Sequence, residues 1–576
     1  MQRKDKRNRK RRSRLGPVIA ALALIVIAAG VLLAQRYIPS RERMAPEAYF
    51  GTLAENEAAV VLQDHLLESR ALYQDGALYL DYGLVRDELN SRFFWDEGND
   101  QMLFTTALET YEIPVNSAEY RIDGTTQQYD RPIVLNTENG LYVCADFLQL
   151  YTNVEYTPAG EGPSRHVLIR NQWGLQKTAT LRRDTAVRYL GGIKSEILTD
   201  ALKGDTVQVL EELENWSRVV TPDGYIGYVP NRRLTETQES EIVREFEEPQ
   251  YPSLTRDEKI RMVWHQIDYE EANDHLSEDI AAMKGINVIS PTWFSVADNE
   301  GAIHSMADEE YVKTAHEAGL EVWGLISNFS PDVDTTVLLS STAARRRMVD
   351  TLIQEALRLG MEGINLDFEY IREESSFSYV QFARELSIGC RKNGLVFSID
   401  VPVPMDFNRY FNRRELGTVA DYLIVMGYDE HYYGSESAGS VASLGFEENG
   451  ITGTLEEDVP AGKIISGIPF YTRIWYTVDN GDGTANVTSE VLGMDAVERT
   501  LESYSVTPVW DEGTAQEYAS WTVEDGTLCE IWIENEKSLA QKAQLINRYE
   551  LGGFAAWMLR DARDTVWDVL AETVTG

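Results

Sequence analysis

The stretch GINLDFEY, residues 363–370, decides how the rest of this chain is interpreted. Its polar side chains occupy every second position: Asn365, Asp367 and Glu369. Alternation with a period of two is typical of a β-strand and places these side chains on one face, while Leu366 and Phe368 face the other way. Helical patterns precede and follow the stretch, which favours a buried strand over a solvated edge strand with its polar face in water.

Two carboxylates on one face of a buried strand have a chemical consequence. An unpaired buried charge is very costly, and neighbouring carboxylates repel each other, which raises the pKa of one of them. General acid catalysis near neutral pH needs a carboxyl group that keeps its proton beside one that is ionised. Asp367 and Glu369 are therefore the first candidate catalytic residues.

Strands and helices alternate from residue 259 onward, which predicts an α/β (β/α)8 TIM barrel. Strands are expected at Arg261–Ile267, Gly285–Ser290, Glu321–Ser327, Gly363–Glu369, Leu395–Val401, Asp421–Tyr428, Lys463–Phe470 and Gly552–Leu559. Helices are expected at Leu276–Met283, Asp308–Ala318, Ala343–Leu359, Tyr379–Lys392 and Ser538–Tyr549. The interval 472–536 is too long for a helix crossover and predicts a small α+β insertion. Glu369 ends the fourth strand, where such barrels carry their functional side chains.

Several separated pieces of this barrel resemble glycoside hydrolase family 18, the chitinase and N-acetylglucosaminidase family. The family pattern Asp-x-x-Asp-x-Asp-x-Glu falls on four positions: Glu362, Asn365, Asp367 and Glu369. The other pieces are the run Met426-Gly427-Tyr428-Asp429, the run GIPFYTRIW at 467–475, which includes Tyr471, and Trp557 on the eighth strand. The resemblance covers residues 258–574. Within it, Tyr-Asp-x-His at 428–431 is similar to a motif of the spore-cortex and cell-wall branch of the family.

The resemblance implies a division of roles among these residues. Glu369 would donate a proton to the glycosidic oxygen, while the substrate's own 2-acetamido oxygen acts as the nucleophile. Most glycosidases use a pair of protein carboxylates, and this family is an exception to that rule. Asp367 would hold the acetamido N–H, and Tyr428 its carbonyl. Asp429 would stabilise developing positive charge, and Trp557 would stack on the sugar ring, although a tryptophan closing the barrel floor is the alternative.

Four further residues are candidates for substrate binding: Asn365, Met426, Tyr471 and Trp293. For Trp293, which follows the second strand, lining a sugar subsite and anchoring a loop are equally good interpretations. The sequence departs from the family pattern at Asn365, because an amide cannot share a proton with Asp367 as a carboxyl can. It also departs at Glu362 and lacks the Ser-x-Gly-Gly piece of the third strand, which favours peptidoglycan over chitin as substrate.

The N-terminus predicts a membrane anchor. Residues 1–14 carry nine Lys or Arg and one Asp, a net charge of +8, and would form a basic cytoplasmic tail. Residues 15–36 are an apolar run long enough to span a bilayer, so the positive-inside rule places the rest of the chain outside the cell. A cleaved signal peptide is the alternative, since small residues occur at 28–30 and 34. The chain as a whole has a formal net charge of −40, which argues against nucleic acid as a partner.

Two accessory parts are predicted between the anchor and the barrel. Residues 50–172 contain an approximate duplication of turn, strand, short helix and strand, which resembles the copper-amine-oxidase-type N-terminal module without implying copper. Residues 178–235 resemble the bacterial SH3-like domain through the pieces KGD, W-x-x-V and DG-x-x-GYV. That family usually recognises cell-wall peptides, and a spacer is the alternative. Residues 236–257 are a Glu-rich linker, expected to be extended.

The sequence therefore predicts a membrane-anchored extracellular glycosidase of a Gram-positive-type bacterium. It would cleave β-1,4 bonds at N-acetylglucosamine residues, in peptidoglycan more readily than in chitin, by substrate-assisted retaining catalysis. A non-catalytic, lectin-like wall protein is the alternative. A metal-dependent hydrolase is disfavoured, and no cofactor is expected, because the seven histidines and three cysteines show no ligand spacing.

Overall fold

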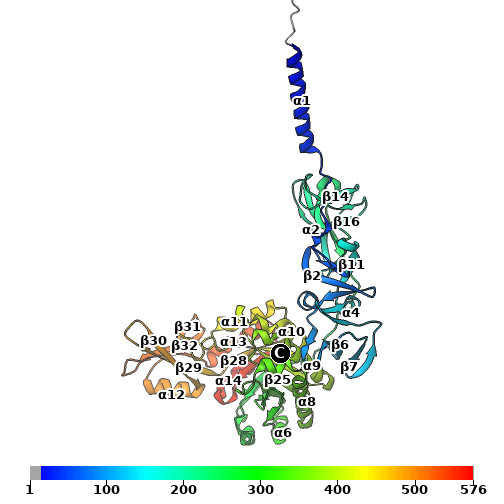
Figure 1. Ribbon diagram of the computed structural model, residues 1–576. Helices are drawn as coiled ribbons and strands as arrows, with labels where there is room; N and C mark the ends of the chain where they lie inside the picture. The colour runs from blue at the N-terminus through cyan, green and yellow to red at the C-terminus, as the bar shows by residue number, and fades with distance from the viewer. Residues whose placement is uncertain (1–14, 575–576) are drawn as a thin grey trace, which may run out of the picture. The chain divides into compact units, whose positions relative to one another are not determined.

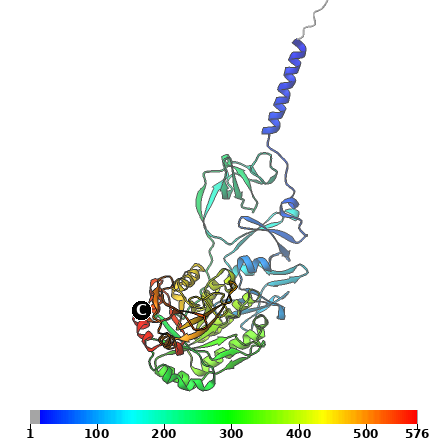
Figure 2. The ribbon, with the colours of Figure 1, turned by 90° about the vertical axis from the view of Figure 1, so that its left-hand side faces the viewer.

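The computed structural model describes residues 15–574, so the predicted basic tail at 1–14 lies outside the described residues. The chain divides into two compact units. One contains residues up to Ser91 together with Pro132–Glu248, and the other contains Arg92–Arg131 together with the chain from Pro249 onward. The second unit holds the barrel, drawn from green to red in Figures 1 and 2.

The barrel of the second unit is closed by parallel strands. Around the ring these are β20 (Ile260–His265), β21 (Val288–Pro291), β24 (Glu321–Ser327), β25 (Gly363–Asp367), β26 (Val396–Pro402), β27 (Tyr422–Met426), β28 (Ile464–Pro469) and β34 (Gly553–Trp557). The ring closes because β34 pairs with both β28 and β20, and β21 pairs with β24. The predicted TIM barrel is confirmed, and the predicted strands agree with the observed ones to within a few residues.

Alternate residues of each strand face two different cores. One cluster lies inside the ring and includes Trp264, Trp323, Leu325, Val396 and Tyr422. The other lies between the strands and the helices outside them, and its members on β25 are Ile364 and Leu366. The polar residues of β25 therefore point into the ring, as the period-two alternation predicts.

Helices cover the outside of the ring: α6 (Glu309–Glu317), α8 (Thr342–Leu359), α9 (Ser376–Asn393), α10 (Arg413–Val419), α11 (Leu444–Glu456), α13 (Glu536–Arg548) and α14 (Asp564–Thr573). The predicted helix Leu276–Met283 is wrong in extent, since a 3₁₀ turn at Glu270–His275 leads into the single turn α5 (Leu276–Asp279). Sequence patterns missed three of these helices, α10, α11 and α14, and the glycines of α11 have low helix propensity. A Cβ at Gly450 would lie 3.1 Å from Val403, so this helix packs too closely for a larger residue.

The predicted insertion between the seventh and eighth strands is a separate small sheet with one covering helix. Its strands are β29 (Tyr471–Asp479), β30 (Ala485–Gly493), β31 (Val509–Asp511), β32 (Gln516–Thr522) and β33 (Leu528–Ile533), and its helix is α12 (Met494–Tyr504). The sheet order is β30-β29-β33-β32-β31. It extends to one side of the barrel in Figure 1. Its first strand follows β28 almost directly, so Tyr471 stays near the strand ends of the barrel.

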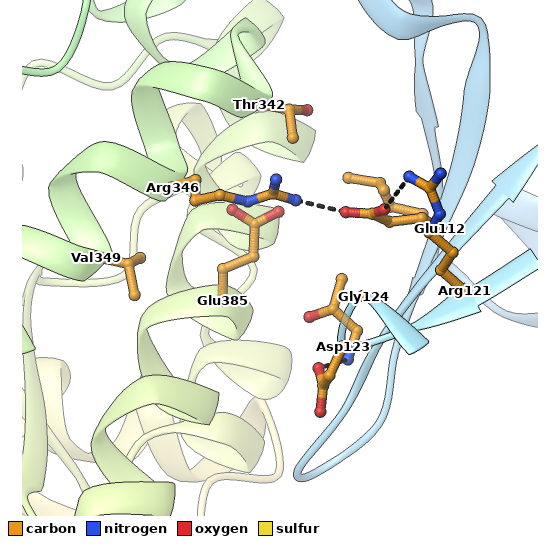
Figure 3. A pocket seen from close by; sticks show the side chains of 10 residues that line it. Glu112, Arg121, Asp123, Gly124, Thr342, Arg346, Val349 and Glu385 are labelled. Atoms are coloured by element: carbon orange, nitrogen blue, oxygen red, sulfur yellow. Dashed lines mark hydrogen bonds and ion pairs between the residues drawn. The ribbon is translucent and has the colours of Figure 1, made fainter. Parts of the chain in front are cut away.

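A second small sheet, which we call the docked sheet, belongs to the barrel unit although it comes from residues 93–128. Its strands are β4 (Phe93–Asp96), β5 (Gln101–Thr105), β6 (Thr110–Pro114), β7 (Glu119–Ile122) and β8 (Thr125–Gln128). Figure 3 shows Arg346 of α8 reaching across to Glu112 of β6, with an N–O distance of 2.5 Å. A cavity of about 430 Å³ lies beside this contact. Lys392 of α9 pairs with Asp123 at 2.6 Å.

The remaining unit contains two sheets. The first has the order β11-β12-β1-β2-β3-β10-β9, with β1 (Glu57–Leu62), β2 (His65–Gln74), β3 (Ala77–Asp81), β9 (Val134–Thr137), β10 (Gly140–Cys144), β11 (Glu155–Ala159) and β12 (His166–Arg170). In the predicted duplication, β3 is followed by the single turn α3 (Tyr82–Leu84) and a π-helical turn, and β10 by α4 (Ala145–Tyr151). β3 and β10 pair antiparallel as neighbours.

The second sheet has the order β15-β14-β18-β17-β16-β13-β19. Its strands are β13 (Gly174–Thr180), β14 (Thr185–Arg188), β15 (Ile197–Ala201), β16 (Thr206–Glu212), β17 (Trp216–Val220), β18 (Ile226–Pro230) and β19 (Gln238–Ile242). β19 lies inside the predicted linker 236–257 and pairs with β13, so the start of that segment is a strand rather than a free extended chain.

The first helix of the same unit is α1 (Leu15–Tyr37). Within the described residues it is the helix long and apolar enough to cross a membrane, over Val18–Tyr37, and this part is not buried against the protein. A signal sequence near an N-terminus meets the same criteria of length and composition, so the helix is compatible with a retained anchor and with a cleaved signal peptide.

Candidate active site

The candidate site is built at the C-terminal ends of barrel strands. Asp367 is the last residue of β25, and Glu369 lies two residues beyond it rather than inside the strand as predicted. The strand ends early for a physical reason. Its pairing with β24 stops at Asp367, and the backbone N–H groups of Glu369 and Tyr370 instead donate to the side-chain oxygen of Asn328, at 3.1 and 3.4 Å.

Asn328 is a fully buried residue directly after β24. Its amide nitrogen donates to the hydroxyl of Thr335 at 3.0 Å, which fixes the orientation of the amide and leaves its oxygen as the acceptor for the Glu369 segment. The backbone that carries Glu369 is therefore held by a side chain from the segment that follows the neighbouring strand.

The carboxyl group of Glu369 keeps its proton more readily than an ordinary glutamate. Residue Glu369 reaches solvent, but the surrounding protein desolvates its carboxyl group, and the negative charge of Asp429 adds to this effect. Together they raise the pKa of Glu369 to about 7. A carboxylic acid with this pKa is suited to donate a proton near neutral pH.

Asp367 is almost completely buried, at 6% exposure. Burial raises its pKa well above the ordinary value, and the charges of Asp400 and then Glu369 raise it further. Its Oδ1 atom has no hydrogen-bond partner within the described residues. A buried acceptor without a partner is costly, so this oxygen is placed to accept a donor from a ligand.

Tyr428 and Asp429 follow β27, and both lie near the same cavity as Glu369. The hydroxyl of Tyr471 donates to Asp429 Oδ1 at 2.6 Å and holds that carboxylate in place. The rings of Tyr428 and Tyr471 meet edge to face with centroids 6.2 Å apart. Asp429 has a backbone φ of 59°, a left-handed conformation that Asp tolerates better than most residues and that is frequent at functional sites.

Asn365 is at the centre of a buried polar network inside the barrel. Its side-chain oxygen accepts from Trp264 Nε1 at 2.9 Å and from the hydroxyl of Ser290 at 3.3 Å. Its amide nitrogen donates to Ser398 at 3.1 Å and to Asp400 at 2.8 Å. Asn365 is fully buried, so it lies beneath the open site rather than on its surface.

Trp557, at the end of β34, is partly buried and lies in a cluster with Tyr428, Tyr471, Val441 and Ala442. Its ring also meets that of Trp264 edge to face, with centroids 5.7 Å apart. The structure thus brings Trp557 to the site together with both tyrosines. Met426, the last residue of β27, lines the same cavity as Glu369.

Trp293 is not brought to this site. Its side chain is completely buried, and its Nε1 donates to Asn273 at 2.8 Å. A ring with no free face cannot stack on a sugar, so the loop-anchoring interpretation is favoured. Glu362 is also apart, because it precedes β25 at the opposite end of the strand and accepts the N–H of Val322 at 2.9 Å.

Two cavities meet at Glu369. One of about 500 Å³ extends over the segments after β26 and β27, where Met405, Phe407 and Tyr432 line it. The other, of about 690 Å³, extends over the segments after β24 and β25, where Asp332 and Arg372 line it. The candidate proton donor therefore lines two cavities, one over each pair of neighbouring strand ends.

Sequence reasoning missed Asp400, Ser398 and Asn328. A signal for the first two was present, because Ser398 and Asp400 alternate with apolar residues in β26 in the same way as the polar residues of β25. Asn328 carries no local signal, since its partner lies 41 residues later in the chain. Within residues 15–574, no group of three or more His, Cys, Asp or Glu side chains is arranged to hold a metal ion.

A closed parallel barrel with carboxylates and tyrosines gathered at the C-terminal ends of its strands has its functional side chains where TIM-barrel enzymes carry their active sites. Residues 294–562 match the glycosyl hydrolases family 18, and residues 186–235 match the bacterial SH3 domain. The barrel of this chain belongs to glycosyl hydrolase family 18 and is a glycosidase domain, and the chain also carries a bacterial SH3-like domain.

Relatives agree with this family. An uncharacterized glycosylase of Bacillus subtilis is 26% identical over 297 residues, which cover 50% of this chain and 84% of the relative. The cortical fragment-lytic enzyme of Bacillus subtilis is 25% identical over 243 residues, 41% of this chain and 55% of that enzyme. The chain thus spans about half of the second relative. The C-terminal domain of a Desulfitobacterium hafniense protein shares the fold, with a TM-score of 0.50, 20% identity, and coverage of 55% of this chain and all of that domain.

Proposed function

We propose that this protein is a membrane-anchored extracellular glycosidase that hydrolyses β-1,4 bonds at N-acetylglucosamine residues of peptidoglycan, with retention of configuration. The observation that carries the proposal is the carboxyl group of Glu369, whose pKa is raised to about 7 at the junction of two cavities. Three observations support peptidoglycan as the substrate: the resemblance of this sequence to the cell-wall branch, the name of the cortical fragment-lytic relative, and the SH3-like domain.

In the first step, Glu369 gives its proton to the glycosidic oxygen as the bond from that oxygen to C1 breaks. The substrate's acetamido oxygen forms a new bond to C1, which yields an oxazolinium ion and the free alcohol of the leaving sugar. Asp367 would accept the acetamido N–H with its unpartnered Oδ1. Tyr428 would donate its O–H to the acetamido oxygen and orient it for attack.

In the second step, a water molecule attacks C1, the bond from C1 to the acetamido oxygen breaks, and the water gives its proton to the Glu369 carboxylate. This restores both the acetamido group and the acid. Two inversions at C1 give net retention. Asp429, held by Tyr471 at 2.6 Å, would stabilise the positive charge that develops on the sugar and the acetamido group. Trp557 would offer a ring face at the site to the apolar side of the sugar.

The central test uses the full-length chain in detergent, incubated with purified peptidoglycan and with chitooligosaccharides. We expect new reducing ends with the wild type and their loss with Glu369→Gln. Glu317→Gln is a matched control, because Glu317 is an exposed carboxylate on the outer helix α6. Glycan binding without turnover by the wild type would overturn the proposed activity and leave a lectin-like function.

Membrane anchoring is tested separately on cells that express the full chain. Retention of α1 predicts that the protein stays in the membrane fraction after alkaline carbonate extraction, with its original N-terminus. A mature protein that begins after residues 28–34 and is released into the medium would contradict the anchor and indicate a cleaved signal peptide.

A further inference from the structure

Asp400 is a buried carboxyl group to which the proposed mechanism gives no role. It lies on β26 at 2% exposure and makes no ion pair within the described residues. Its one hydrogen-bond donor among the described residues is the amide of Asn365, at 2.8 Å. A buried carboxyl without a basic partner is costly unless a proton or a specific set of donors neutralises it.

The orientation of the Asn365 amide is fixed by its partners. Trp264 Nε1 can only donate, so the atom of Asn365 that faces it must be the amide oxygen. The amide nitrogen then faces Ser398 and Asp400. With an aspartate at position 365, two carboxylates would face each other at this distance, and their repulsion would be strong in a buried site.

Asp400 is also a neighbour of Asp367. The strands β25 and β26 pair in parallel as far as Leu366 and Ile399, and the two aspartates occupy the next position on each strand. The charge of Asp400 is the largest charge effect on Asp367, and both carboxyl groups have pKa values raised well above the ordinary range, chiefly by burial. The other titratable groups that face the pair are Glu369 after β25, Tyr428 after β27 and Tyr379 on α9. None of these is basic, and the cation that acts on Tyr379 is Arg413 on α10.

We propose that Asp400 on β26 shares one proton with Asp367. It would take the part of the carboxyl that the family pattern places on β25 at position 365. The amide of Asn365 at that position then serves as a hydrogen-bond donor to Asp400. The inference rests on the proposed function. When the acetamido N–H of the substrate arrives, the shared proton moves to Asp400, so that Asp367 is ionised and accepts the N–H. Asp400 does not touch the substrate and is a positioning residue.

The test compares the full-length wild type with Asp400→Asn, Asn365→Asp and the exchanged double variant Asn365→Asp/Asp400→Asn. Rates on a soluble chitooligosaccharide are measured from pH 4 to pH 9. In the singly ionised pair, the protonated Asp400 stabilises the Asp367 carboxylate. Asp400→Asn removes that carboxyl and makes ionisation of Asp367 harder, so the acid limb of the profile should move about one unit higher, with kcat reduced about tenfold. The basic limb should stay in place.

The exchanged double variant decides whether the two positions act as a pair. Asn365→Asp alone crowds three carboxyls together and should move the acid limb upward. The double variant restores one amide and one carboxyl in contact and should recover most of the lost activity. An Asp400→Asn profile that superimposes on the wild type, or losses that simply add in the double variant, would overturn the proposal.

A measurement that needs no turnover separates this inference from the proposed function. Groups whose pKa is raised by folding bind more protons in the folded state, so they destabilise the fold as pH rises above their unfolded pKa near 4. The Tm of the wild type should therefore fall more steeply from pH 4 upward than the Tm of Asp400→Asn. Equal slopes would overturn the inference, whereas inactivity of the wild type with unequal slopes would overturn the activity alone.

Discussion

The side-chain oxygen of Asn328 accepts the backbone N–H of Glu369 at 3.1 Å, so the residue that follows the third barrel strand sets the backbone position of the proposed proton donor beyond the fourth. We predict that Asn328→Ala lowers kcat far more than it raises KM, because the acid loses its direction while the sugar contacts remain. Steady-state kinetics on a soluble oligosaccharide measure this split.

The same substitution should lower the free energy of unfolding by about 1–3 kcal/mol, because two backbone N–H groups lose their acceptor. Thr335→Val is the matched control, since it removes the partner of the Asn328 amide and leaves the acceptor oxygen present. It should have a smaller effect on kcat. Equal kcat for Asn328→Ala and the wild type would show that Asn328 does not position Glu369.

The pH dependence of kcat/KM should show a basic limb near pH 7. Glu369 must be protonated to act, and its raised pKa of about 7 means that activity falls as pH rises through that value. The charge of Asp429 contributes to the raised pKa, so Asp429→Asn should move this limb to lower pH as well as lowering the rate. A limb that does not move would assign the titration to another group.

Substitution of Trp557 should affect substrate binding, whereas substitution of Trp293 should affect stability. Trp557→Ala removes a ring at the site and should raise KM about 3- to 10-fold, the equivalent of an aromatic contact, with little change in kcat. Trp293→Ala empties a fully buried position and should destabilise the fold by about 3–5 kcal/mol without changing KM of the folded protein. Oligosaccharide kinetics and thermal unfolding, measured on both variants, distinguish the two effects. A raised KM in Trp293→Ala would indicate that Trp293 binds the sugar and does not only anchor a loop.

The mode of cutting follows from the two cavities that meet at Glu369. A glycan strand can occupy both, with the scissile bond between them, so we predict internal cleavage. Mass spectrometry of early products from long glycan strands should show a mixture of sizes. Release of a single small product from the first minutes onward would indicate cutting from a chain end.

The sequence predicted the barrel well because its strands obey a local rule. Each buried strand is a short apolar run with a fixed period, and the polar residues that break the run in β25 mark the site. Asp367, Glu369, Tyr428 and Trp557 lie close together in the structure because the ends of parallel strands share one edge of the barrel.

What the sequence could not predict depends on contacts between distant residues. The hydrogen bond between Asn328 and Glu369 requires β24 and β25 to be neighbours. Asp400 can be recognised as part of the site only from its contact with Asn365 on the next strand. The buried position of Trp293 was also hidden, since an aromatic residue after a strand suits either a sugar site or a core. The glycines of α11 hid a helix because its packing, not its propensity, makes it form.

The docked sheet has a consequence for the order of events during synthesis. Glu112 meets Arg346, which lies 234 residues later in the chain. At the usual rate of about 5–20 residues per second, the ribosome makes this helix roughly 10 to 50 s after the sheet. The nascent sheet must remain soluble through that interval without its partner. Its last strand, Thr125–Gln128, is exposed and has the polar sequence TTQQ. This edge carries no apolar side chain, but it also lacks the charges and prolines that protect many edge strands from pairing, so the newborn chain depends on the early arrival of its partner helix.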